Sequence, residues 1–276
     1  MGYHKRKMKL YERIQKKDVL LVSKVALFLL FCFATVMFVT QIMQAKHEQD
    51  VFMDLANIVA ETEQDRSQNA DNDDVWESTA EEKTEKPLPQ YEDIYAMNND
   101  FIGWLSIPNT KIDYPVMFTP DEPEYYLRRS FDKRDFQSGT PFIGKGGNID
   151  SDCFIIYGHN MKNDTMFGTL DNYADENFWR ENKTFSFNTL YEYREYEVFA
   201  TVKTKILYTD ENGLRYYNYA GELSEADYKN LEEWLSANSV YNTDISLTYG
   251  EQILILSTCS YHTTNGRFVV AARRIK

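Results

Sequence analysis

Residues 251–275 constrain the fold most, because two short apolar runs flank a polar turn. Residues 252–256 are rich in isoleucine and leucine, Cys259 ends the first run, and residues 267–272 form the second. This pattern predicts two paired β-strands. A cysteine where a buried strand stops is held rigidly and can face a cleft, and Arg267 at the start of the next strand can reach the same cleft. A core cysteine beside a surface arginine explains these residues equally well.

A second apolar run, residues 152–157, also ends next to a reactive side chain, His159. Cysteine attacks as the thiolate, and a free thiol with a pKa of about 8.5 is mostly protonated at neutral pH. A histidine can serve as the acid and base for such a nucleophile, which makes His159 the predicted partner of Cys259. The competitor is His262, three residues after Cys259, for which a solvated loop position is the simpler interpretation.

Short strand-like runs also fill the rest of the C-terminal two thirds. The chain has 20 tyrosines and 17 phenylalanines, which favour sheet over helix. A capping-box pattern at Ser224 predicts a helix inserted between late strands. Its apolar face would carry Tyr228, Leu231, Trp234 and Leu235. Many short strands with few helices predict a mainly β fold, a closed or nearly closed β-barrel. The further runs lie at residues 101–108, 112–117, 139–143, 184–190 and 193–208.

The N-terminal region predicts a membrane anchor. Residues 1–18 are basic and polar, and residues 19–43 are almost entirely apolar. A helix of that length rises about 37 Å, enough to cross roughly 30 Å of hydrocarbon. Basic residues before the span predict a cytoplasmic N-terminus and an external C-terminal domain. The rival interpretation is a cleaved signal peptide, but the stretch is long for one and residues 40–45 lack a small-x-small cleavage signal.

The charge is divided unevenly along the chain. Residues 1–43 carry +6, whereas the whole chain carries −13, which leaves −19 for residues 44–276. So acidic a chain is a poor nucleic-acid binder, because phosphate contacts need clustered Lys and Arg. Residues 44–90 are expected to form an acidic stalk. Apolar residues at 51–59 recur at helical spacing, so a short helix either packs on the domain or continues the span, and residues 61–86 are too polar to bury a core.

Other site types fit the sequence poorly. The three cysteines do not suggest a disulfide framework. A zinc site of Cys153, His159, Cys259 and His262 is disfavoured, because Cys153 lies six residues before His159 on one strand, about 20 Å away. The glycine-rich residues 144–147 lack the spacing of a phosphate loop, and no EF-hand-like carboxylate run is present. No cofactor or metal is therefore predicted.

Three motifs together resemble a sortase, most closely class B. They are Tyr-Gly-His-Asn-Met at 157–161, Leu-Ser-Thr-Cys at 256–259 and Asn-Gly-Arg-Phe-Val-Val at 265–270. The resemblance covers roughly residues 91–276, and one departure is Ile255, where the family often has threonine. It implies a sortase-type barrel with N-terminal helices and a helix inserted between late strands. The expected organisation is a cytoplasmic tail (1–18), a transmembrane anchor (19–43), an extracellular stalk (44–90) and a catalytic domain (91–276).

The resemblance also implies an activity. Cys259 would cleave the C-terminal sorting signal of a surface protein after threonine, in an Asn-Pro-x-Thr or similar Pro-x-Thr motif. A cell-wall peptide amine would then resolve the thioester. His159 matches the catalytic histidine, Arg267 the arginine that positions substrate or stabilises the oxyanion, and Ser257 a position near the substrate groove. A surface ion pair is the alternative for Arg267, and a structural role for Ser257. A cysteine endopeptidase and a non-catalytic, anchored wall-binding scaffold are the alternative functions.

Overall fold

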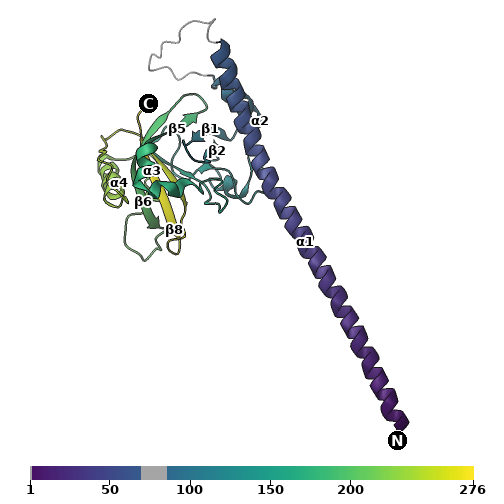
Figure 1. Cartoon of the computed structure of the whole chain (residues 1–276). Coiled ribbons are helices and arrows are strands. Elements are labelled where there is room, and N and C mark those ends of the chain that lie inside the picture. Colours follow the sequence, from purple (N-terminus) through teal and green to yellow (C-terminus); the bar gives the residue numbers. More distant parts are fainter. Residues whose placement is uncertain (1, 70–85) are drawn as a thin grey trace. The chain divides into compact units, whose positions relative to one another are not determined.

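The computed structural model describes residues 2–69 and 86–276. They fall into two compact units, one ending at Val51 and the other running from Phe52 to Lys276. Helix α1 (Gly2–Asn69) forms the first unit and opens the second (Figure 1). Within it, Leu21–Thr40 is long and apolar enough to cross a membrane, and a signal sequence would have the same properties. The predicted acidic stalk is helical as far as Asn69, and residues 70–85 lie outside the described residues.

The second unit is a closed barrel in the order β1-β2-β3-β4-β7-β8-β6-β5. Two neighbouring pairs, β2 with β3 and β4 with β7, are parallel, and the others are antiparallel. The prediction of a mainly β, closed barrel is confirmed. The strands are β1 (Phe101–Ser106), β2 (Asp113–Met117), β3 (Phe142–Ile143), β4 (Cys153–Tyr157), β5 (Thr184–Thr189), β6 (Glu195–Lys205), β7 (Ile253–Cys259) and β8 (Gly266–Arg274).

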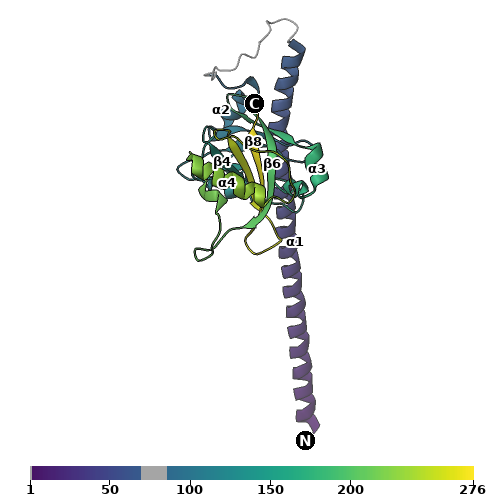
Figure 2. The same cartoon turned by 90° about the vertical axis from the view of Figure 1, so that its left-hand side faces the viewer.

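Short helices decorate the barrel, and the longest of them is the predicted insertion between late strands. Helix α4 (Glu225–Ala237) lies between β6 and β7 in sequence, and its N-cap Ser224 accepts a hydrogen bond from the Asp227 main chain, as the sequence pattern predicts. Figure 2 shows α4 lying across the outer side of the barrel. The other short helices are α2 (Pro89–Met97), η1 (Tyr125–Arg128), η2 (Leu170–Ala174), α3 (Glu176–Glu181) and η3 (Tyr216–Asn218).

The strands beneath α4 are buried on both faces. Rings of Phe154, Phe187 and Tyr196 pack against one another on one face of the sheet. The alternate residues of these strands, among them Cys153 and Ile155, pack in a second cluster with Leu231 and Leu235 of α4. Side chains alternate across a strand, so this arrangement explains why residues 253–256 are apolar without interruption. It also fixes which face each side chain near Cys259 occupies.

The last described turns of α1 belong to the barrel unit. Phe52, Leu55 and Val59 are buried, and their spacing places them on one side of the helix. The ring of Phe52 packs edge-on against Tyr114 of β2, with centroids 5.2 Å apart, and against Phe136 at 5.8 Å. Of the two alternatives for residues 51–59, these contacts show packing on the domain.

Candidate active site

The register of the barrel brings Cys259 and Arg267 together. Cys259 ends β7 and lies directly opposite Arg267 of β8. The neighbouring pair is joined by a main-chain hydrogen bond from Ser260 to the Gly266 carbonyl, 2.9 Å long. Hydrogen-bonded and non-hydrogen-bonded pairs alternate along an antiparallel ladder, so Cys259 and Arg267 form a non-hydrogen-bonded pair, in which side chains lie closer. Both side chains are half-buried, so the thiol and the guanidinium share one partly open rim.

His159 reaches the same rim from the other side of β7. Strand β4 runs parallel to β7, with Tyr157 paired to Ser257. β4 ends at Tyr157, and His159 follows it by two residues, just as Cys259 follows Ser257 by two residues at the end of β7. The structure therefore gathers the three residues predicted from separate motifs at one end of three adjacent strands.

A main-chain carbonyl holds the imidazole of His159. Its Nε2 lies 2.9 Å from the carbonyl oxygen of Leu127 in η1. A carbonyl only accepts, so Nε2 carries hydrogen, and in the neutral ring Nδ1 is the acceptor. Burial lowers the pKa of His159 from its usual value, the Leu127 carbonyl raises it, and the charge of Arg128 lowers it further. The net direction is downward, which favours a neutral imidazole able to accept a proton.

The guanidinium of Arg267 retains donors for a ligand. Its Nη1 donates to the Gly266 carbonyl at 2.9 Å, and within residues 2–69 and 86–276 no carboxylate forms an ion pair with it. The surface ion pair considered as an alternative is thus not found in the described chain. The main-chain N–H that follows Cys259 is already bonded to the Gly266 carbonyl and so is not available to a ligand. Arg267 is therefore the better placed donor of the two.

Ser257 is buried rather than open to the rim. Its side chain is 1% exposed, and its Oγ lies 2.8 Å from the hydroxyl of Tyr216 in η3, which is equally buried. Burial raises the pKa of Tyr216 to about 12, while its hydrogen bond to Ser257 and the charge of Arg267 act in the opposite direction. The hydrogen-bond partner of the Ser257 hydroxyl is thus Tyr216. The role of Ser257 near the substrate groove stays a prediction.

The other thiol and the other imidazole near the motifs have different surroundings. Cys153 is fully buried, and burial raises the pKa of its thiol, which keeps it protonated. The Nδ1 of His262 lies 2.9 Å from Ser260 Oγ, on the exposed turn after β7. Among the described residues, no group of three or more His, Cys, Asp or Glu side chains is arranged to hold a metal ion.

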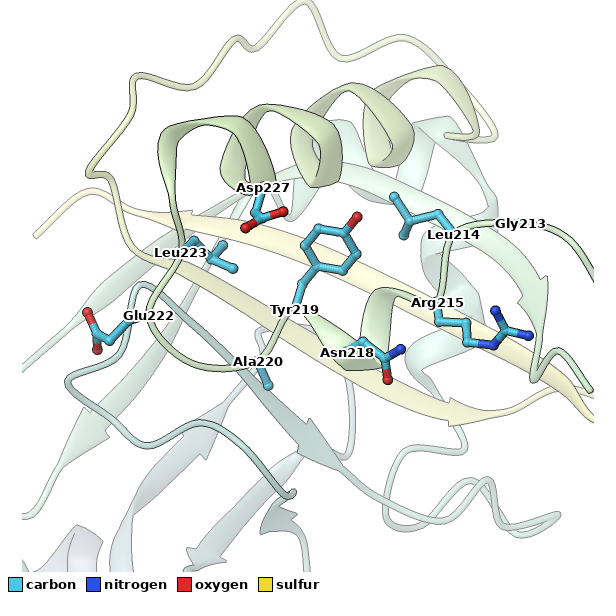
Figure 3. Close-up of a pocket in the computed structure, with 9 residues that line it drawn as sticks. All are labelled: Gly213, Leu214, Arg215, Asn218, Tyr219, Ala220, Glu222, Leu223 and Asp227. Carbon is cyan, nitrogen blue, oxygen red and sulfur yellow. The ribbon is translucent and has the colours of Figure 1, made fainter. Parts of the chain in front are cut away.

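Sequence reasoning missed Leu127 and Tyr216, which hold His159 and Ser257. Leu127 acts through its carbonyl, which no side-chain pattern reveals. Tyr216 lies in the connection between β6 and α4, and nothing in its neighbourhood distinguishes it from the adjacent tyrosines. A hollow of about 420 Å³ opens in the same connection beside α4, lined by residues such as Leu214, Tyr219 and Asp227 (Figure 3). None of the three rim side chains lines this hollow, so it is separate from the candidate active site.

Comparison with known proteins identifies the family. The sortase domain model matches residues 105–275. Sortase B of Staphylococcus aureus is 30% identical over 193 residues, which cover 68% of this chain and 75% of that protein. Sortase B of Listeria monocytogenes is 31% identical over 189 residues, 66% of this chain and 73% of that protein. A solved complex of S. aureus sortase B with a substrate has a TM-score of 0.67 and 26% identity, and covers 85% of this chain and 99% of that one.

The chain belongs to the sortase family. Its similarity to the two sortase B proteins and to the solved sortase B fold places it in class B, as the three motifs predict. The chain is accordingly an enzyme, a cysteine transpeptidase of the sortase type that works through an acyl-enzyme thioester.

Proposed function

We propose that Cys259 is the nucleophile, His159 the general acid and base, and Arg267 the group that stabilises the oxyanion. The Cys259 thiol gives its proton to the imidazole of His159, and the resulting thiolate attacks the carbonyl carbon of a threonine in the sorting signal. The C–N bond to the following residue then breaks. The imidazolium of His159 gives its proton to the leaving amine. An incoming amine then attacks the thioester, forms a new amide bond and releases the thiol. Two observations support this assignment. Cys259 is paired with Arg267, and the parallel pairing of β4 with β7 ends at Tyr157 and Ser257, two residues before His159 and Cys259 respectively.

The proposed substrate is a surface protein with a Pro-x-Thr type sorting signal, and the proposed acceptor is an amine of the cell-wall peptide. That S. aureus sortase B, a relative with the same fold, has been solved in complex with a substrate supports a substrate site in this fold. The negative charge that develops on the threonine carbonyl oxygen needs a fixed donor. Arg267 is suited to this role, because its planar guanidinium is permanently charged. Among the described residues, the hydrogen bond that it donates goes to the Gly266 carbonyl, which leaves other N–H groups for a ligand. Ser257 is proposed to support binding close to that rim.

We further propose that the enzyme is held at the cell membrane by its apolar helix, with residues 1–18 in the cytoplasm and the catalytic domain outside. The proposed anchor is residues 19–43, which include the apolar helix segment Leu21–Thr40. Residues 44–90 would connect it to the catalytic domain at 91–276. The basic N-terminal residues favour this orientation.

The test is mass spectrometry of the full chain in detergent after incubation with a library of sorting-signal peptides. The expected product is a peptide joined to Cys259 through a bond that hydroxylamine cleaves, as a thioester requires. Cys259→Ala should form no adduct and release no peptide fragment. Undiminished cleavage by this variant would overturn the assignment of the nucleophile.

Two comparisons separate the neighbouring possibilities. Addition of an amine acceptor should convert the released product from a free acid to an amide, whereas a hydrolytic endopeptidase would give the acid in both cases. His159→Ala should abolish turnover and His262→Ala should retain it. Loss of turnover only in His262→Ala would identify that residue as the proton donor instead.

A further inference from the structure

The segment that carries His159 departs from the sheet just where the active site begins. The β4–β7 ladder is extended past Tyr157 by a main-chain bond from Gly158 to the Ser257 carbonyl, 3.3 Å long, and by the Thr258 hydroxyl, which donates to the Gly158 carbonyl at 2.7 Å. One step further, a regular parallel ladder would direct the main-chain N–H of residue 160 to the carbonyl of residue 259.

The main chain of Asn160 instead pairs elsewhere. It forms a bridge with Met166, and the His159 carbonyl accepts a hydrogen bond of 2.9 Å from the Phe167 N–H. The chain after His159 therefore folds back on itself rather than along β7. Because Cys259 is in a non-hydrogen-bonded pair with β8, its carbonyl points away from β8 and toward the place that β4 has left.

The side chain of Asn160 fills that place. Its Nδ2 donates to the Cys259 carbonyl oxygen at 3.0 Å. The same amide nitrogen lies 3.3 Å from Oδ2 of Asp171 in η2. Both neighbours are acceptors, so only the NH₂ group satisfies them and the orientation of the amide is fixed. An aspartate at position 160 would present oxygen to both.

We propose that Asn160 is a positioning residue that sets the separation of the Cys259 thiol and the His159 imidazole. It is covalently adjacent to His159 and hydrogen-bonded to the main chain of Cys259, so it ties the two residues together directly. The Leu127 carbonyl fixes the ring of His159 independently. The inference rests on the proposed function, in which these two side chains perform the chemistry.

The kinetic test uses the full chain in detergent with the peptide cleaved by the wild type. We expect Asn160→Ala to lower kcat roughly 10- to 100-fold, because a misplacement of about 1 Å costs about that much. KM should stay within about twofold, because a residue that only positions the two reacting side chains affects the chemical step and not peptide binding. Asn160→Asp, of nearly the same shape, should be at least as impaired, because its carboxylate faces the Cys259 carbonyl and Asp171.

Asn163→Ala is the matched control. Asn163 lies in the same turn, and its side chain accepts from the Thr165 hydroxyl at 2.7 Å and not from β7. It should keep kcat within about twofold of the wild type. Equal losses in Asn163→Ala and Asn160→Ala would mean that the whole turn matters and would overturn the proposal, as would near wild-type kcat in both Asn160 variants.

A measurement without substrate separates this inference from the proposed function. The carbonyl carbon resonance of Cys259 in chain labelled at its cysteine carbonyls, assigned with Cys259→Ser, should move in Asn160→Ala and stay in Asn163→Ala. A wild type that cleaves no sorting peptide would count against the proposed function alone. If the Cys259 carbonyl resonance does not move in Asn160→Ala, the positioning role proposed for Asn160 is wrong, whatever the activity of the variant.

Discussion

The hydroxyls of Tyr216 and Ser257 are buried together, 2.8 Å apart. Ser257 lies two residues before Cys259, the proposed nucleophile. Tyr216→Phe leaves Ser257 without this partner, and an unsatisfied buried hydroxyl costs about 1–3 kcal/mol. We therefore expect a loss of that size in the free energy of unfolding, measured by urea denaturation of the full chain.

Ser257→Ala completes the cycle. Because one hydrogen bond joins the two hydroxyls, the double variant should lose less stability than the sum of the single variants, by about 0.5 kcal/mol or more. Strict additivity would show that the bond contributes nothing. Ser257→Ala also tests the role predicted from the motif: a raised KM at unchanged kcat would assign Ser257 to peptide binding.

Arg267 should not tolerate lysine. Lysine keeps the charge but lacks the planar fork, and it cannot both donate to Gly266 and present a fixed donor to the rim. We expect Arg267→Lys to lower kcat/KM by roughly 100-fold, the usual effect of removing an oxyanion donor. Arg274→Lys is the control. Arg274 lies on β8, as Arg267 does, but at the far end of the strand, where it forms an ion pair with Glu192. Full activity in Arg267→Lys would leave charge alone as the requirement.

The titration of His159 should respond to Arg128. The positive charge of Arg128 lowers the pKa of His159, after burial, which is the larger cause. Arg128→Ala should therefore raise the pKa of His159, measured from the ring proton resonances of the full chain as pH is varied. Arg129→Ala should not raise it, because that guanidinium lies over the ring of Tyr125, 4.1 Å from its centroid. A downward movement in Arg128→Ala would contradict the electrostatic account.

The same shift makes stability depend on pH. The folded chain holds His159 with a pKa below 6.5, so the unfolded chain binds the proton first as pH falls. The contribution of His159 to the free energy of unfolding is therefore fully present above about pH 6.5, and it is lost as the pH falls below that value. His159→Gln should therefore flatten the fall in unfolding free energy below pH 6.5. An unchanged pH dependence would place the cause in other groups.

Helix α1 should contribute to the stability of the barrel unit through Phe52. Phe52 is 5% exposed and packs on Tyr114 and Phe136, and truncation of a buried phenylalanine typically costs about 3–5 kcal/mol. Phe52→Ala should lower the free energy of unfolding by about that amount. Met53→Ala is the matched control, because Met53 is 57% exposed on the next position of the same helix. Equal effects of the two changes would argue against packing.

The strand pattern and the motifs predicted most of the fold and of the rim, because both depend on local sequence. Residues 253–256 are apolar on both faces, and such a run indicates a strand whose two sides are covered. The sequence could not reveal that β4 and β7 pair in parallel, since about a hundred residues separate them. Their register is set by packing across the barrel and not by any turn between them.

The sequence also could not predict contacts that are made through the main chain. The Leu127 carbonyl and the bridge of Asn160 with Met166 follow from where the chain turns, not from which side chains it carries. The end of the strand was predicted correctly: β7 runs through Ser257 and Thr258 and stops at Cys259. The two hydroxyls can lie within the strand because Tyr216 and Gly158 provide their partners.

The position of β7 between β4 and β8 has a consequence for biosynthesis. A nascent chain that has emerged only as far as Cys259 contains the thiol and the imidazole, but it lacks Arg267 and the strand that links β7 to β6. Pairings between distant segments form slowly, so the barrel closes late, after β8 has been made. The reactive sulfur thus acquires its guanidinium neighbour, Arg267, only once the last strand of the barrel has been made.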